Sequence, residues 1–422
     1  MTDDEKNASE QAGSRPSART LRGLDGLNFF MADVRDGLGP YLSAFLKGDQ
    51  HWSPGPIGIV MGASSVAAAV FQVPGGLLVD SLRAKRALVV GSGLLIGAAC
   101  LLIAFVPRFA VVAVAQVMIG AASAVIPPVL AALSLGIVGR KLLPARVSRN
   151  ETFNHAGNFV AAALAGTLGH LAGYRWIFYL VCAFAVASAL VVTRIDPGEI
   201  DHEVARGGEA PESNRGQGGP VPIREVLARR DVLVFLAAVV LFHAGNAAML
   251  PLAGQVLAQS HPGKDAIALS ACIVAAQLVM VGVAWAVGRA TARGVGRKPI
   301  FLVALAVLPV RGVLFTLFSS PVSVVAIQLL DGVAAGIFGV ISILIASDLM
   351  RGTGRFNLAQ GLTALATGLG AALSNVGSGY LVQSFGYRTG FLSLTAVALG
   401  ALAFFALLMP ETRTTENDAP AG

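Results

Sequence analysis

The chain has 422 residues, of which 55% are hydrophobic and only 13% are charged. A soluble domain usually has about 25% charged residues, so this composition excludes an ordinary soluble protein and indicates an integral membrane protein. The net charge of +7 does not by itself indicate a nucleic-acid partner, and none is expected, because the basic residues gather in the loops on one side of the membrane.

Apolar runs of about 20 residues recur along the chain, and a helix of that length crosses the roughly 30 Å hydrocarbon core of a bilayer. Barrel strands need only about 10 alternating residues, so the sequence predicts an all-α membrane protein. Twelve spanning helices are expected, near residues 24–46, 55–79, 87–106, 109–138, 152–172, 176–194, 231–258, 265–288, 299–318, 321–348, 357–383 and 389–409.

The lysines and arginines divide unequally between the two sets of loops. If the chain begins in the cytoplasm, the tails, the central linker and the loops on that side hold 24 of them, and the opposite loops hold five. Such an excess marks cytoplasmic loops. We therefore expect a multi-pass protein of the cytoplasmic (inner) membrane with both termini inside. Residues 1–22 lack the apolar core of a signal peptide and are expected to form a cytoplasmic tail.

A polar segment divides the chain into two halves that repeat each other. Residues 195–230 are rich in Gly, Pro and charges and predict a largely disordered cytoplasmic linker. It separates a first bundle at 23–194 from a second at 231–409, which is followed by a tail at 410–422. A shift of 212 residues places "QVMIGAASAV" over "QLLDGVAAGI", and a shift of 213 places "GYRWIF" over "GYRTGF", which indicates an internal repeat.

Twelve helices in two repeated halves with a cytoplasmic linker resemble the major facilitator superfamily over residues 24–409. The best-known motif of that family, between helices two and three, is similar to "GGLLVDSLRAKR" here. Gly76, Asp80, Lys85 and Arg86 match it, and two other positions depart from it. The resemblance implies two pseudo-symmetric six-helix bundles and a secondary transporter that works by alternating access.

The same motif predicts an inner gate. An Asp at a helix end beside basic turns can pair with a neighbouring helix and hold the cytoplasmic side shut. Glu151, near the cytoplasmic end of helix five, is expected in the same region. Ala292 stands where Asp80 stands in the first half, so such a latch is one-sided. The alternative is a loop that only sets topology.

The first predicted helix contains "MADVRDG", with three charges near mid-membrane. A charge there costs at least about 2.5 kcal/mol, so it should face protein or a water-filled cavity. At about 100° per residue Asp33 and Asp36 share a helix face, whereas Arg35 points away. We expect the two acids to couple transport to protons. The alternative is a structural contact with Arg35 or a helix end. Gly37 and Pro40 predict a kink just beyond.

The repeat places two polar residues of helix seven at the depth of these acids. Pro40 aligns with Pro251, and in that register His243 corresponds to Ala32 and Asn246 to Arg35. His243 is predicted to share in proton coupling, because a histidine titrates near neutral pH. The alternative is a histidine that bonds a backbone carbonyl in a helix contact.

Two further charges lie deep in the second half. Arg311 on helix nine is expected to pair with Asp331 on helix ten. The alternative for Asp331 is direct contact with substrate.

In the resembling fold, helices one, four, seven and ten line a central cavity, which makes their polar side chains candidates for substrate contact. Polar residues at the mouths of helices five and eleven are also candidates, with a hydrogen bond between helices as the alternative. The full set is Asn28, Arg35, Gln116, Asn158, Asn246, Gln328, Asp331 and Gln360.

These patterns predict a proton-coupled transporter of a small organic solute. Export is the expected direction, by analogy with bacterial members of the resembling family. One alternative is proton-driven uptake of a small anion, with Arg35 and Arg311 as counter-charges. Another is a membrane sensor or scaffold that does not transport.

Several other classes of function lack support in the sequence. No HExxH or GxGD motif occurs, so we do not expect an enzyme. The three cysteines lie within apolar runs and indicate no disulfide or metal site. The expected partners are the solute, protons and the lipid bilayer, and we expect a monomer without a cofactor.

The predicted topology can be tested by labelling. With the native cysteines replaced by serine, Ser213→Cys in the linker should react with a membrane-impermeant maleimide only after the cells are opened. Gln50→Cys, in the loop after helix one, should react in intact cells, because that loop is outside in the predicted topology. Reaction of both cysteines in intact cells would contradict it.

Overall fold

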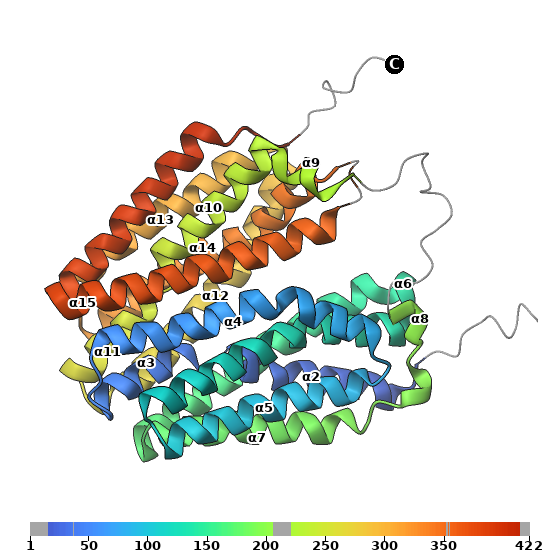
Figure 1. Cartoon of the computed structure of the whole chain (residues 1–422), viewed down its shortest axis with the longest axis horizontal. Coiled ribbons are helices and arrows are strands. Elements are labelled where there is room, and N and C mark those ends of the chain that lie inside the picture. Colours follow the sequence, from blue (N-terminus) through green and yellow to red (C-terminus); the bar gives the residue numbers. More distant parts are fainter. Residues whose placement is uncertain (1–15, 37, 206–220, 352, 354, 414–422) are drawn as a thin grey trace, which may run out of the picture.

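The structure, a computed structural model, describes residues 16–36, 38–205, 221–351, 353 and 355–413, which form helices and connecting turns without a strand (Figure 1). The predicted all-α fold is confirmed. The helices are α2 (Ala18–Asp36), α3 (Gly39–Gly48), α4 (Pro54–Ser81), α5 (Lys85–Phe105), α6 (Phe109–Ala172), α7 (Arg175–Val192), η1 (Pro197–Glu199), α8 (His202–Ala205), α9 (Ile223–Ala228), α10 (Arg230–Asn246), α11 (Met249–Ser260), α12 (Asp265–Ala292), α13 (Arg297–Leu317), α14 (Pro321–Leu349) and α15 (Phe356–Leu408).

The membrane crossings match the twelve predicted ones. Nine stretches of the described residues are long and apolar enough to span a bilayer. One of them, residues 358–408, holds two helices that meet at Gly386, where φ is 82°. The pair α2–α3 and the part of α6 beyond Gly139, where φ is 71°, supply the other two. Glycine fits both turns because a Cβ would be strained at a positive φ.

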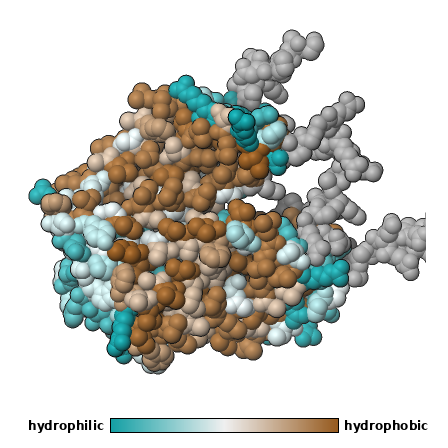
Figure 2. Space-filling view, viewed as in Figure 1, coloured by the Kyte–Doolittle hydropathy of each residue, from teal (hydrophilic) through white to brown (hydrophobic). Residues whose placement is uncertain are grey.

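The helices form two bundles, α2 to α8 and α9 to α15 (Figure 1). Each has an apolar core, and the core of the first bundle also includes Ala258, Ala266 and Leu269 of α11 and α12. Phe45 and Phe178 pack edge to face in the first core, and Phe301 and Phe405 pack together in the second. Figure 2 shows apolar side chains over the middle of the visible face and polar ones toward its two ends. This distribution is the surface that a bilayer requires.

The two bundles are joined by side-chain hydrogen bonds at the end of the molecule where α3 and α11 lie. The Ser43 hydroxyl donates to the carbonyl oxygen of Pro251 at 3.0 Å and accepts from the Gln255 amide at 2.9 Å. The hydroxyls of Tyr41 and Ser270 are 2.6 Å apart. Ser43 and Gln255 are 212 residues apart, which is the repeat offset, so matching positions of the two halves meet here.

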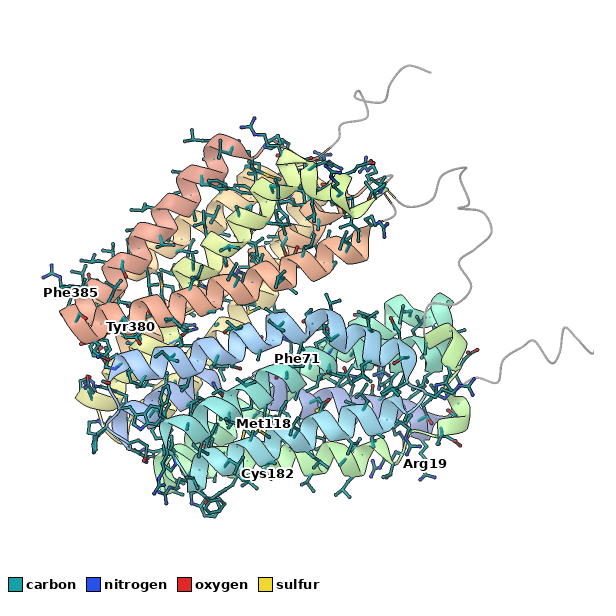
Figure 3. The ribbon with its side chains drawn as sticks, in the orientation of Figure 1. Arg19, Phe71, Met118, Cys182, Tyr380 and Phe385 are labelled. Carbon is teal, nitrogen blue, oxygen red and sulfur yellow. The ribbon has the colours of Figure 1, made fainter. Side chains whose placement is uncertain are left out.

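Helices α4 and α15 also touch at this end. The backbone N–H of Gly55 donates to the Gln383 side chain at 3.0 Å. A Cβ added at Gly58 would come within 2.2 Å of the carbonyl oxygen of Asn375, so only glycine permits this approach. Helices α4 and α15 lie along the boundary between the bundles, and Figure 3 labels one residue on each. Tyr380 of α15 is near this end, and Phe71 of α4 is farther from it.

Both ends of the predicted linker are folded against the bundles. The N–H of Asp201 donates to the backbone carbonyl of Gly136 at 2.9 Å. The N–H of Val221 donates to the backbone carbonyl of Thr353 at 3.2 Å. The predicted disorder therefore does not extend over these ends. Residues 206–220, in the middle of the linker, lie outside the described part of the chain.

Two glutamates that are 212 residues apart tie helix ends together at the linker end of the molecule. The carboxylate of Glu199 accepts from the N–H of Ser17 at 2.9 Å, next to the start of α2. The carboxylate of Glu411 accepts from the N–H groups of Arg297 at 2.8 Å and Lys298 at 3.1 Å, at the start of α13. A carboxylate is stabilised there by the free N–H groups and the helix dipole.

We expect Glu411→Gln to loosen the start of α13 by about 1 kcal/mol, the usual value of a helix cap. Partial burial raises the pKa of the Glu411 carboxyl, but four backbone N–H donors outweigh it and hold the pKa below its usual value. Because the pKa is lowered, the contribution of the Glu411 carboxylate to stability is complete above the ordinary glutamate pKa of about 4.3. It is lost as the pH falls through the folded-state pKa. Thermal melts of the purified proteins at several pH values between about 3 and 7 should show that the melting temperatures of the wild type and the variant converge at acid pH. A constant difference across that range would contradict this role.

Candidate functional site

The helices that begin the two halves are both broken at the same point of the repeat. The first ends at Asp36 and resumes at Gly39, with Pro40 as the second residue of α3. The seventh ends at Asn246 and resumes at Met249. The predicted kink after Asp36 is confirmed as a break between two helices.

The linking residues Leu38, Ala247 and Ala248 keep helical φ and ψ, so each break is a kink within one membrane crossing. At the second kink the N–H of Ala248 donates to the Ser374 hydroxyl at 3.0 Å. Interrupted helices are a common feature of transporter binding sites.

The acids predicted to carry protons lie in the last turn of α2. Asp33 and Asp36 belong to this helix, and so does Arg35. Their side chains fall outside the described part of the structure, so the roles assigned to all three remain predictions.

Beside the break between α10 and α11, four polar residues from three helices form one connected cluster. The Arg311 guanidinium lies 2.7 Å from the Asp331 carboxylate. It donates to the side-chain oxygen of Gln328 at 2.7 Å and to the side-chain oxygen of Asn246. The Asn246 amide donates to Asp331 at 3.3 Å, and the Gln328 amide donates to the same carboxylate at 2.7 Å. The predicted pairing of Arg311 with Asp331 is confirmed.

Burial explains why this cluster has so many members. The Arg311 side chain is only 1% exposed, and the Asp331 side chain is 20% exposed. A cation that has left water needs a counter-charge and further hydrogen bonds to offset its lost hydration. Asp331 supplies the charge and the two amides supply the bonds, while the Phe315 ring lies 5.5 Å from the guanidinium carbon.

His243 occupies a different environment from this cluster. Its Nδ1–H donates to the carbonyl oxygen of Val239 at 3.0 Å, and its ring meets that of Phe338 edge to face with centroids 4.8 Å apart. A Cβ at Gly370 of α15 would lie 2.9 Å from the Cβ of His243. These contacts match the helix-contact alternative. A role in proton coupling remains a prediction.

The other predicted cavity residues are not part of the cluster formed by Asn246, Arg311, Gln328 and Asp331. Asn28 is buried and donates to the Leu24 carbonyl of its own helix at 2.8 Å. Gln116 is buried on α6, whereas Asn158 and Gln360 are half-buried. Their contact with substrate remains a prediction.

At the predicted inner gate, Lys85 acts as a cap for α4. The side chain is fully buried, and its Nζ donates to the carbonyls of Val79 at 2.7 Å and Leu82 at 3.1 Å. Asp80 is exposed at the same helix end. A Cβ at Gly76 would meet no atom within 4 Å, so packing does not require glycine there in this conformation.

The remaining gate candidates differ in their surroundings. Arg86 is half-buried, and its Nε has no hydrogen-bond partner among the described residues. Glu151 is exposed on α6 and accepts from Asn154 at 3.5 Å. The gating role of both residues remains a prediction.

One ionic cluster was missed by the sequence analysis. The buried Asp25 carboxylate of α2 accepts from Arg146 at 2.6 Å and from Arg149 at 2.9 and 2.8 Å. The side-chain oxygen of Asn150 accepts from Nε of Arg146 at 2.6 Å. The available signal was an acid in the first turn of a predicted span whose basic partners precede helix five.

Asp331→Ala should lower the free energy of unfolding by about 3–5 kcal/mol, because it leaves the buried Arg311 charge uncompensated. The control is Asp231→Ala, which removes an ion pair with Arg229 whose two side chains are 28% and 38% exposed and should cost only about 0–1 kcal/mol. Denaturant titration of the purified protein in detergent measures both values. Equal losses would contradict the special status of the buried pair.

Comparisons with known proteins agree with this architecture. The family model for the Major Facilitator Superfamily matches residues 24–353 and 286–421. MFS-type transporters described as uncharacterised, from two strains of Mycobacterium tuberculosis, are 46% identical over 397 residues, which cover 93% of this chain and 94% of each relative.

Solved structures of low sequence identity share the fold. The nucleoside transporter NupG superposes with a TM-score of 0.71 at 14% identity, covering 92% of this chain and 98% of that one. A peptide transporter POT in complex with sulfate has a TM-score of 0.71 at 14% identity, with 93% and 96% covered. A D-xylose-proton symporter has a TM-score of 0.66 at 15% identity, with 94% and 98% covered. The chain therefore belongs to the major facilitator superfamily, as a multi-pass secondary transporter of that type.

Proposed function

We propose that this transporter moves a small organic solute across the inner membrane by alternating access and couples this movement to protons. The observation that carries the proposal is the break of two repeat-related helices beside intramembrane polar residues. In the first half the break follows Asp36, and in the second it follows Asn246.

The position of the contacts between the bundles supports alternating access. The bonds of Ser43 with Pro251 and Gln255 close the end where α3 and α11 meet. Farther along the boundary, on α6 and α12, the His155 ring and the Gln277 amide are 3.1 Å apart. Such contacts must break when that end opens, so they are candidates for the outer gate.

The proposed proton carriers are Asp33 and Asp36. Both are ionisable residues within a membrane-crossing helix, where an uncompensated charge is costly and a functional role is the default interpretation. Both acids lie in the turn before the break. Bending of the helix at the break would alter their surroundings and so couple their protonation to the movement. The D-xylose-proton symporter among the structural neighbours shows that proton coupling occurs on this fold.

Uptake of an anion is the less favoured alternative. Its proposed counter-charges are Arg35 and Arg311, and the Arg311 guanidinium is 1% exposed and already paired with Asp331. The export direction rests on the family resemblance alone, and the experiment below tests it together with proton coupling.

The Asp33→Asn, Asp36→Asn and double variants should retain solute exchange and lose accumulation against a gradient, because asparagine keeps the size of the side chain but cannot ionise. Proteoliposomes that contain a pH-sensitive dye would first be screened with nucleosides, small peptides and pentoses. An imposed pH gradient in either direction then shows which way the responding solute is driven.

The matched control is Asp49→Asn, an exposed acid in the turn that follows α3. It should accumulate solute like the wild type. If the double variant also accumulates solute at the wild-type rate, the acids of α2 are structural and the proposed coupling is wrong. If no solute changes the internal pH or exchanges, a sensor or scaffold is favoured over a transporter.

A further inference from the structure

We propose that a cavity between α5, α7 and α8 binds the phosphate headgroup of an anionic phospholipid. This cavity, called the basic cavity below, has a volume of about 470 Å³. It lies at the linker end of the first bundle and plays no part in the proposed proton coupling. Its lining residues are Arg83, Ala84, Arg86, Ala87, Val90, Ala189, Val192, Pro197, Ile200 and His202.

The polar lining of the basic cavity is cationic or able to donate hydrogen bonds. Arg83 and Arg86 come from the turn before α5 and from its first turn, and His202 begins α8. None of the described residues that line the cavity is acidic. A phosphate group would therefore meet two guanidinium groups without a competing carboxylate in the wall.

Two buried atoms of this lining lack a partner. Nε of Arg86 and Nδ1 of His202 are both buried, and neither has a hydrogen-bond partner among the described residues. Burying such groups without a partner is unfavourable. A rotation of each side chain toward the cavity would open these atoms, and phosphate oxygens would then accept from the guanidinium and, in one tautomer, from the imidazole ring.

A cavity at the linker end of the second bundle differs in its charges. Its polar lining is Arg229, Arg230, Asp231 and Lys298, of which Lys298 is the repeat equivalent of Arg86. Arg229 there is paired with Asp231 at 2.6 Å and also donates to the Leu349 carbonyl at 2.7 Å. That cavity contains an acidic partner for its arginine, and the described lining of the basic cavity does not.

The surroundings of the basic cavity favour a lipid over soluble phosphate. Its walls include the apolar Val90, Val192 and Ile200. Exposed Leu94, one helical turn beyond Val90 on α5, and exposed Leu190, in the last turn of α7, provide an apolar surface for acyl chains. Basic pockets between membrane helices, at the level of the headgroups, are known places for anionic lipids.

Native mass spectrometry of the full-length transporter in a neutral detergent tests the proposal. The probe is dioleoylphosphatidylglycerol, compared with dioleoylphosphatidylcholine. We expect tighter retention of the anionic lipid. The single variant Arg83→Ala and the double variant Arg86→Gln/His202→Gln should each lose affinity for it, by about fivefold for each basic residue removed. Arg86→Lys keeps the charge and should retain most of the binding.

The control is Lys298→Gln, which removes the repeat-equivalent charge and should leave the lipid affinity unchanged. Equal retention of the two lipids, equal loss in Lys298→Gln, or unchanged binding in Arg86→Gln/His202→Gln would overturn the proposal. A large excess of inorganic phosphate should not displace the lipid. If it does, and binds alone with the same dependence on Arg86, the site belongs to soluble phosphate. Circular dichroism confirms folding of each variant, and no transport assay is needed.

Discussion

Every backbone polar group in the hydrocarbon region must find a partner within the protein, and this constraint organises the molecule. It explains why the described residues are almost entirely helical. It also gives meaning to the breaks after Asp36 and Asn246, because backbone groups that leave a helix at this depth must be shielded by neighbouring protein or line a cavity. The breaks are tolerated where α3 and α11 pack together through Ser43 and Gln255. Structural closure at one end and kinked helices beside it are thus parts of one arrangement.

Charge follows the same rule as backbone. Arg311 of α13 lies in an apolar bundle, where it is held by one carboxylate and two amides from α10 and α14. Asp25 is held by two arginines near the linker end of the first bundle. These clusters join helices that are distant in sequence, and each would leave a costly unpaired charge if its helices separated. Movement during transport is therefore expected to preserve each bundle and to alter the contacts between bundles.

The repeat has kept positions while allowing their chemistry to diverge. Glu199 and Glu411 are equivalent in sequence and both accept from backbone N–H groups, but one lies at the start of the first membrane helix and the other at the start of the ninth. Arg86 and Lys298 are repeat equivalents, but Lys298 lines a cavity that contains Asp231 and the described lining around Arg86 holds no acid. Repeated architecture conserves the direction and depth of helices, whereas local side-chain partners depend on a few substitutions around them.

The sequence by itself determined the membrane class, the twelve helices, the two halves and the kink after Asp36, because long apolar runs, glycine and proline act locally and leave a clear pattern. It also identified the partner of Arg311, since few acids lie at that depth. Tertiary structure decided which face each polar side chain presents. It placed Lys85, the first residue of α5, on carbonyls at the end of α4, His243 against Phe338, and Asp25 beside Arg146. These outcomes depend on the rotation and packing of helices far apart in the chain, and helical periodicity alone does not specify which neighbour a given face will meet.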